Sequence, residues 1–159
     1  METLNLRKER KGKKMDYKKG KNHIYIRIDK GGSIVQTILS ICKKENIPGG
    51  YFQGIGACDT VTISTYIPEK NDFIDHTISG MIEMISLMGN ISVDDLNTPF
   101  QHSHGVFSYL KDNGEIAVAA GHLKDARISY TGEIVLQIAE ERIGRMFDTS
   151  VGIDVWKLA

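Results

Sequence analysis

Three histidines have the spacing of a metal site. The tripeptide "HSH" places His102 and His104 two positions apart, and "AGHL" supplies His122 eighteen residues after the second of them. Residues two apart on an extended strand face the same side, so the first pair can contact one metal ion. Three histidine ligands with an open fourth position are typical of catalytic zinc and related divalent sites. An HxH pair alone is weak evidence, because isolated histidines are more often surface or satisfied polar groups.

A hairpin would bring the third histidine to the first two. "DNG" at 112–114 separates the strand-like segments "FSYL" and "EIAVAA", which is a strong hairpin signal. Glu83 is the candidate fourth ligand or general base. It shares strand parity with Ile85 and Leu87 in "MIEMISLMG", so we expect it to point inward, where a carboxylate needs a partner such as a cation.

Other catalytic motifs are absent from the sequence. It has no G-x-S-x-G nucleophile elbow and no P-loop, and "GIGACD" lacks the third glycine and the following helix of a dinucleotide fingerprint. Cys42 and Cys58 are too few for a disulfide scaffold, so we interpret both as core residues. No stretch of 18 apolar residues and no signal-peptide pattern occurs, which favours a cytoplasmic protein that does not bind membranes.

The net charge of zero conceals a basic N-terminus and an acidic remainder. Residues 1–21 contain nine Lys or Arg and three acidic residues, a net charge of +6, which leaves −6 for residues 22–159. We therefore predict a basic flexible arm at 1–21 and a single domain at 22–159. The arm fits a solubilising tail or a segment that contacts nucleic-acid phosphates. Its candidate contacts are Arg7, Lys8, Arg10, Lys11, Lys13 and Lys14.

The remaining pattern predicts an α+β fold with a mainly antiparallel, twisted sheet and one or two packed helices. "HIYIRI" alternates as a half-buried strand, and "SIVQTILSICKKEN" has helical spacing with a capping box at Ser33 and Gln36. Strand-like segments, separated by turn residues such as Thr131–Gly132, fill most of the chain beyond residue 50.

Four ordered segments, "GYFQGIGACDTVTIS", "EMISLMGNIS", "PFQHSHGVFS" and "AGHLKDARISYTGEIVLQ", resemble the plants-and-prokaryotes-conserved domain over about residues 22–140. The resemblance implies an α/β domain that forms a homotrimer. It also implies a divalent metal on His102, His104 and His122, with zinc as the first choice and iron or nickel as alternatives. The family is commonly labelled DNA-binding. Its fold is similar to that of acetolactate decarboxylase, a zinc enzyme with an HxH pair and a further histidine.

Two departures from the plant members limit what carries over. The sequence lacks the Arg-Gly-Arg-Pro hook with which plant members bind the minor groove. Met81 stands where plant members have a partner-binding arginine.

The sequence therefore leaves three functions open. The protein is a DNA-associated regulator that uses its basic arm, or a metal-dependent lyase or hydrolase for a small carboxylated or carbonyl substrate, or a protein with a structural metal. Whether it is an enzyme stays undecided at this stage.

Overall fold

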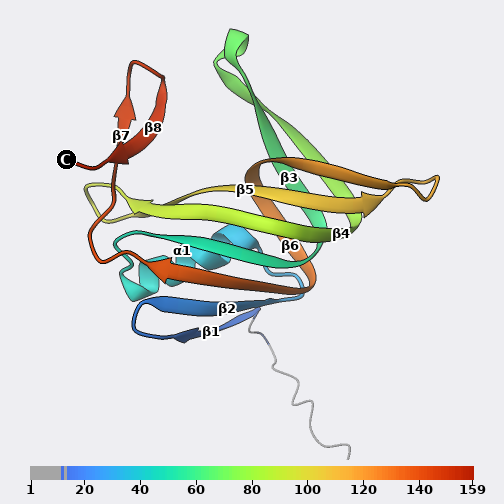
Figure 1. Ribbon diagram of the computed structural model, residues 1–159, viewed down its shortest axis with the longest axis horizontal. Coiled ribbons are helices and arrows are strands. Elements are labelled where there is room, and N and C mark those ends of the chain that lie inside the picture. Colours follow the sequence, from blue (N-terminus) through green and yellow to red (C-terminus); the bar gives the residue numbers. More distant parts are fainter. Residues whose placement is uncertain (1–11, 13) are drawn as a thin grey trace, which may run out of the picture.

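The protein is described by a computed structural model that covers residues 12 and 14–159. The described elements are β1 (Met15–Lys19), β2 (His23–Asp29), α1 (Ile34–Glu45), β3 (Gly50–Ile67), the short 3-10 turn η1 (Pro68–Lys70), β4 (Asp72–Val93), β5 (Pro99–Leu110), β6 (Ile116–Ile138), β7 (Gly144–Asp148) and β8 (Ile153–Lys157). The strands form one sheet in which only the β4–β7 pair is parallel (Figure 1). The predicted α+β fold with a mainly antiparallel sheet is confirmed.

Four strands form a closed hydrogen-bonded circuit. Strand β3 pairs with β4 and β6, and β5 pairs with the same two strands from the other side. Strand β6 is long enough to pair with both: residues 116–122 pair with β5, residues 122–138 pair with β3, and β2 pairs with residues 131–137 on the other edge. The circuit fixes β5 against the first half of β6, where the predicted histidines lie.

The helix covers one face of this sheet. Ser33 caps α1 by accepting a hydrogen bond from the Gln36 amide at 3.1 Å, as its position in the sequence predicts. Asp125 of β6 accepts from the Ser33 hydroxyl at 2.7 Å and from the Val35 amide at 3.1 Å, which docks the start of the helix onto β6. The helix ends at Asn46, which takes the left-handed conformation.

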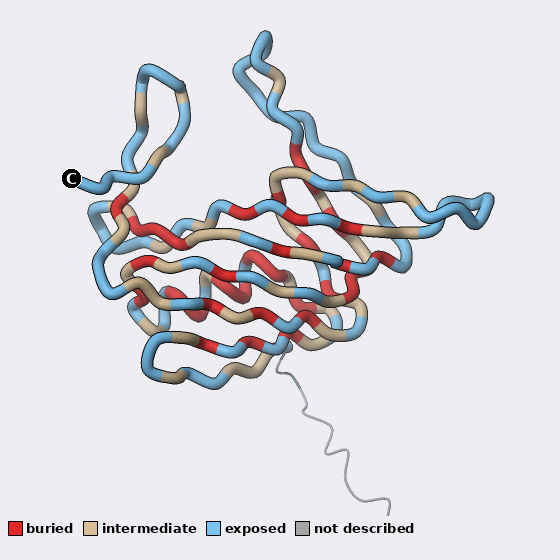
Figure 2. Tube along the Cα trace, in the orientation of Figure 1, coloured by how far each residue is buried: buried red, intermediate tan, exposed pale blue. Residues whose placement is uncertain are grey.

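The core lies between α1 and the sheet, and Figure 2 shows its buried residues alternating with exposed ones along the strands. Its largest fully buried side chains include Phe52, Phe107, Ile38, Leu87 and Leu123. Both cysteines are buried and free, so their prediction as core residues is confirmed. We call the sheet face that points away from this core the outer face.

The structure departs from the expected local structure in three places. Strand β1 lies inside the predicted arm of residues 1–21, and it pairs with β2 from Met15 to Lys19 because its backbone completes that edge of the sheet. Residues 15–19 are therefore part of the sheet. Thr131–Gly132 is no turn, since β6 runs through both residues. Strand β7 was not predicted from the sequence.

Among the residues that the structure describes, no helix has both the length and the apolarity needed to cross a bilayer.

Candidate metal centre

Strands β5 and β6 bring the three predicted histidines together. His102 and His104 project from the outer face of β5, while Ser103 between them is buried on the core side. His104 is the ladder partner of His122 on β6, across the hairpin that "DNG" predicts. The centroids of the three rings are 5.1–5.5 Å apart. The prediction that the hairpin unites them is confirmed.

The imidazole nitrogens have the separations that one metal ion needs. One nitrogen from each of the three rings lies within 4.8 Å of the other two, and the Nε2 atoms of His102 and His104 are 3.4 Å apart. Two ligands of a tetrahedral zinc ion with Zn–N bonds of 2.0–2.1 Å are about 3.3 Å apart. The pair on β5 is therefore already spaced as two corners of such a site.

The surroundings of His102 and His122 favour the neutral form of these two rings. Burial lowers the pKa of His102, and the neighbouring charges of His104 and Arg145 lower it further. Burial, followed by the charges of His102 and His104, also lowers the pKa of His122. A histidine must be deprotonated at one nitrogen to bind a metal, so these shifts prepare both rings as ligands near neutral pH.

Close packing on the core side fixes the backbone that carries the histidine pair. Gly89 of β4 is the ladder partner of Ser103. A Cβ atom at residue 89 would lie 2.4 Å from the Phe52 ring, 2.6 Å from the Ser103 Cβ and 2.8 Å from the His102 carbonyl oxygen. Only glycine lets the two strands approach Phe52 this closely, so the positions of both histidines depend on it.

The tip of the β3–β4 hairpin shields one side of His122. The Phe73 ring packs against the imidazole with centroids 5.4 Å apart, and Tyr66 packs on Phe73 at 5.2 Å. Asp75 nearby accepts from the Ser64 hydroxyl at 2.7 Å and is bound by the Lys124 ammonium. The lysine and then the serine hold the pKa of the Asp75 carboxyl below its ordinary value. Asp75 is thus engaged as an ion-pair partner beside the site.

The C-terminal hairpin of β7 and β8 lies beside His102. Trp156 donates from its indole nitrogen to Asn90 Oδ1 at 3.3 Å, and Asn90 is the ladder partner of His102. Arg145, the ladder partner of Trp156, lowers the pKa of His102 by its charge. Sequence reasoning missed Phe73, Arg145 and Trp156, because no local motif links positions so far apart in the chain to the histidines.

Glu83 does not join the group of three histidines, and the expectation that it points inward is wrong; its role as fourth ligand or general base stays a prediction. It is exposed on β4 opposite Ser108, four residues along β5 from His104 and so roughly 13 Å away at about 3.3 Å per residue. A register shift between Met84 and Ser86 reverses the alternation of β4. Leu87 is consequently buried while Glu83 points outward.

The predicted nucleic-acid contacts fall almost entirely outside the described residues. Lys14 is described: it is exposed, and its ammonium donates to the Gly31 carbonyl oxygen at 3.3 Å. The outcome of the prediction is therefore open for Arg7, Lys8, Arg10, Lys11 and Lys13.

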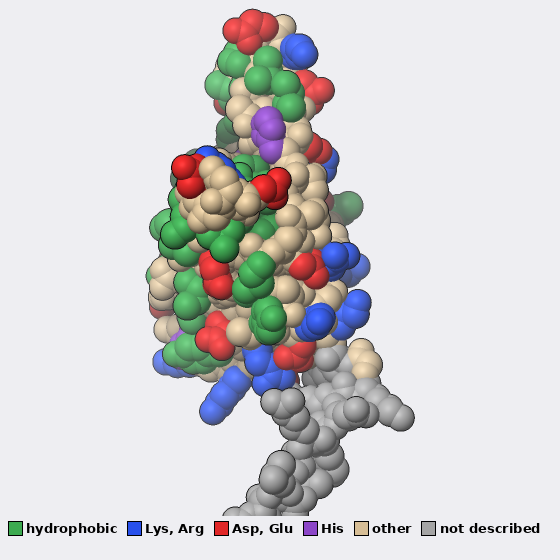
Figure 3. Space-filling model, turned by 90° about the vertical axis from the view of Figure 1, so that its right-hand side faces the viewer, with side chains coloured by type: hydrophobic (Ala, Val, Ile, Leu, Met, Phe, Trp, Pro, Cys, Tyr) green, Lys and Arg blue, Asp and Glu red, His purple; other side chains and the backbone are tan. Residues whose placement is uncertain are grey.

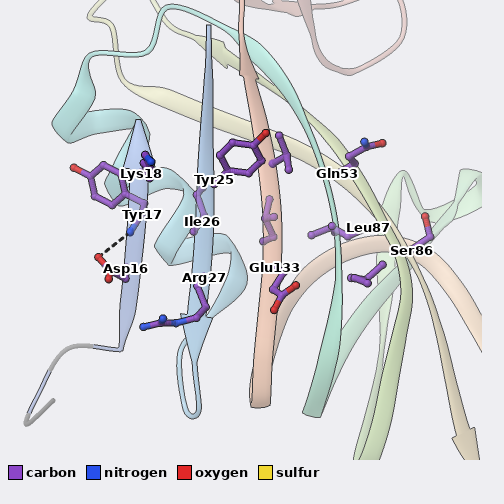
Figure 4. A pocket seen from close by; sticks show the side chains of 14 residues that line it. Asp16, Tyr17, Lys18, Tyr25, Ile26, Arg27, Gln53, Ser86, Leu87 and Glu133 are labelled. Carbon is purple, nitrogen blue, oxygen red and sulfur yellow. Dashed lines mark hydrogen bonds between the residues drawn. The ribbon is translucent and has the colours of Figure 1, made fainter. Parts of the chain in front are cut away.

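A groove lies on the outer face away from the three histidines. The groove crosses β1, β2, β6, β3 and β4, and Figure 4 shows side chains that line it, among them Tyr25, Arg27, Gln53 and Glu133. Its volume is about 730 Å³. The three histidines do not line it.

Comparison with known proteins places the chain in a structural family. Residues 15–140 match the model of the Plants and Prokaryotes Conserved (PCC) domain. No curated protein matches the sequence. Among solved structures, a Bacteroides thetaiotaomicron protein for which DNA binding has been proposed is 28% identical, with a TM-score of 0.82 and coverage of 91% of this chain and 98% of that one.

Two archaeal structures are similar to a comparable degree. A metal-containing protein from Archaeoglobus fulgidus is 29% identical, with a TM-score of 0.74 over 91% of this chain and 99% of that one. A plant- and prokaryote-conserved protein from Pyrococcus horikoshii is 27% identical, with a TM-score of 0.73 over 91% and 95%. Acetolactate decarboxylase from Bacillus subtilis shares only the fold, at 13% identity and a TM-score of 0.51 over 80% of this chain and 57% of that one.

Proposed function

The chain belongs to the Plants and Prokaryotes Conserved domain family, and we propose that it is a metal-binding protein whose ion is held by His102, His104 and His122. One observation carries the proposal: nitrogens of three imidazoles from two adjacent strands converge within 4.8 Å. The metal-containing relative from Archaeoglobus fulgidus, at 29% identity, supports it.

Zinc is the first choice of metal. Three neutral nitrogen donors suit zinc, and the 3.4 Å separation of two of them fits its bond lengths. Iron and nickel accept imidazole ligands as well, so the three are separated by elemental analysis. No carboxylate among the described residues joins the three histidines, and this leaves room for an exchangeable ligand in the fourth position.

An open position favours chemistry over a purely structural ion. Bound there, zinc would act as a Lewis acid toward a ligand oxygen. The side chains of this chain would supply the rest: the histidines orient the ion, and Phe73 restricts water on the side of His122. We therefore propose that the protein is a lyase or hydrolase acting on a small carboxylated or carbonyl compound, and we favour this over a protein whose metal is purely structural.

Metal content per chain is the decisive measurement. Tag-free protein is analysed by elemental mass spectrometry beside His104→Ala and His76→Ala, the latter an exposed histidine outside the centre. We expect near one metal per chain in the parent and in His76→Ala, and a loss of most of it in His104→Ala. Equal metal in all three proteins, or none in the parent, would overturn the site.

DNA association is a second candidate, because DNA binding has been proposed for the similar Bacteroides protein. Its contacts would come from the basic residues before β1, with an affinity that falls steeply as salt rises. Deleting residues 1–12 removes four of the six candidate cations without cutting β1. Binding to duplex DNA that is unchanged by this deletion, or insensitive to salt between 50 and 200 mM, would reject the arm as the contact.

We also propose the homotrimer. The outer face exposes large apolar side chains from β2, β3 and β4 that would be costly to leave in water: Tyr25, Tyr51, Ile55, Ile85 and Met88. Figure 3 shows further hydrophobic side chains among acidic ones at the end of the molecule that carries the β5–β6 hairpin, where Leu110, Ile116 and Val118 are exposed. Light scattering after size-exclusion chromatography should give three times the mass of one chain, and a monomer mass would refute it.

A further inference from the structure

The side chain of Arg145 is held at the edge of the histidine centre. Its Nη1 atom donates to the Ser92 hydroxyl at 3.2 Å, and its Nη2 atom donates to the Asp154 carbonyl oxygen at 3.2 Å. Ser92 is fully buried and lies two residues after Asn90 on the same face of β4. Because Asn90 is the ladder partner of His102, these bonds fix the guanidinium close to the first ligand.

The hairpin around Arg145 is attached to the same place by a second contact. Trp156 on β8 faces Arg145 on β7, and its indole bonds to Asn90 at 3.3 Å. In Figure 1 this hairpin stands at the end of the sheet where β4 ends and β5 begins. An arginine and a tryptophan therefore form one wall beside His102, and their three hydrogen bonds reduce the freedom of both side chains.

The charge of Arg145 has no ion-pair partner in the described part of the chain. Each ion pair there joins other residues, and both bonds of the guanidinium go to neutral oxygens. Arg142, three residues earlier, differs in this respect, since it lies 3.8 Å from the Asp95 carboxylate. A half-buried guanidinium without a counter-charge is a site for an anion, because its planar fork matches the two oxygens of a carboxylate.

We propose that Arg145 binds the carboxylate of a small anionic ligand of the histidine centre. The inference rests on the proposed metal site and adds to it the class of ligand: a carboxylic acid of a few carbons, short enough to touch both Arg145 and the histidines. A hydroxyl or carbonyl oxygen next to the carboxylate would face the histidines, as in a 2-hydroxy or 2-oxo acid. Arg145 is thus a specificity residue for charge.

The test compares a charged ligand with its neutral analogue. The full-length protein is loaded with cobalt(II), whose visible spectrum reports changes at its ligands, and is titrated with lactate, with lactamide and with inorganic phosphate. The variants are Arg145→Gln, Arg145→Lys and Arg142→Gln, which removes the same charge from the paired arginine. Cobalt stoichiometry and circular dichroism are recorded for each, because Arg145 also anchors the hairpin to Ser92.

We expect the parent and Arg142→Gln to bind lactate more tightly than lactamide. In Arg145→Gln the dissociation constant for lactate should rise by about tenfold to a hundredfold, the usual worth of a charge-assisted bond. The constant for lactamide and the cobalt stoichiometry should stay within twofold, and Arg145→Lys should recover part of the loss.

Three results would overturn the inference, and they have different meanings. Equal lactate binding by Arg145→Gln and the parent, with cobalt bound in both, rejects Arg145 while the metal site stands. Phosphate bound more tightly than lactate in an Arg145-dependent way rejects the carboxylate as the ligand class. A parent that takes up no cobalt rejects the metal site, and the ligand class with it.

Discussion

Replacing Gly89 by alanine should damage both the core and the metal centre. The added Cβ would lie under 3.0 Å from three groups, one of them the backbone oxygen of His102. Neither Phe52, which is 1% exposed, nor the paired strand β5 has space to retreat. Overpacking of this kind typically lowers the free energy of unfolding by about 1–3 kcal/mol. Because one of the contacts is with backbone, we expect a loss of about 2–3 kcal/mol for Gly89→Ala.

Thermal unfolding followed by circular dichroism measures this loss. In a domain of this size each kcal/mol corresponds to roughly 2–4 °C, so Gly89→Ala should unfold about 5–10 °C below the parent. The matched control is Gly121→Ala, next to His122. There a Cβ would meet its nearest atom, the Ser64 carbonyl oxygen, at an ordinary 3.4 Å. We expect this variant to be unchanged or more stable by up to about 1 kcal/mol, since alanine restricts the unfolded chain.

The same pair of variants tests the coupling between core and site. Gly89→Ala displaces the backbone on which His102 and His104 sit, and changes behind metal ligands typically cost tenfold to a hundredfold in affinity. Competition with a chromophoric chelator should show a zinc affinity at least about tenfold weaker than the parent's for Gly89→Ala. For Gly121→Ala the zinc affinity should equal that of the parent. A Gly89→Ala protein that melts within 1 °C of the parent would refute the close-packing argument.

Three further predictions follow from contacts outside this pair. Burial raises the pKa of the Cys42 and Cys58 thiols to about 12. At pH 8 the thiolate fraction of each is therefore roughly a thousandfold smaller than that of a free cysteine. A thiol-reactive disulfide should leave both cysteines unmodified at this pH until denaturant is added. The hydrogen bond from the Tyr17 hydroxyl is the largest cause of the lowered pKa of the Glu45 carboxyl. The ionised carboxylate supports β1 through this bond at neutral pH, and the support is lost as the pH falls through the pKa of Glu45 in the folded protein. Tyr17→Phe should raise that pKa toward the ordinary value in an NMR titration and make amide exchange in β1 less sensitive to acid. Phe73→Ala should weaken zinc binding several-fold in the chelator assay by exposing the third histidine to water.

The sequence alone could predict what depends on neighbouring residues. The cap at Ser33, the helix after it and the alternation of β2 are local properties, and the structure has all three. The meeting of the histidines was predictable for the same reason, because one hairpin signal, "DNG", lies between the two segments that carry them.

What the sequence could not show depends on partners distant in the chain. The inward direction expected for Glu83 fails because a bulge near Ile85 reverses the strand, and a bulge leaves little trace in a hydrophobic pattern. The sequence of β1 has the charge pattern of a flexible tail, and only its pairing with β2 makes it a strand. Arg145 lies beside the histidines because its guanidinium bonds to Ser92, 53 residues earlier, and to the Asp154 carbonyl oxygen.

The closed circuit of strands has a consequence for the order in which the molecule folds. His104 and His122, paired across β5 and β6, are 18 residues apart in the chain, whereas Gly50 and Ile138, paired across β3 and β6, are 88 residues apart. The chain entropy lost on closing the longer segment is larger by about 1.4 kcal/mol. We therefore expect the β5–β6 hairpin to form early and the β3–β6 ladder to close late. The three histidines come together in the first of these steps, so an ion bound by the proposed site at that stage would guide the remaining strands into register.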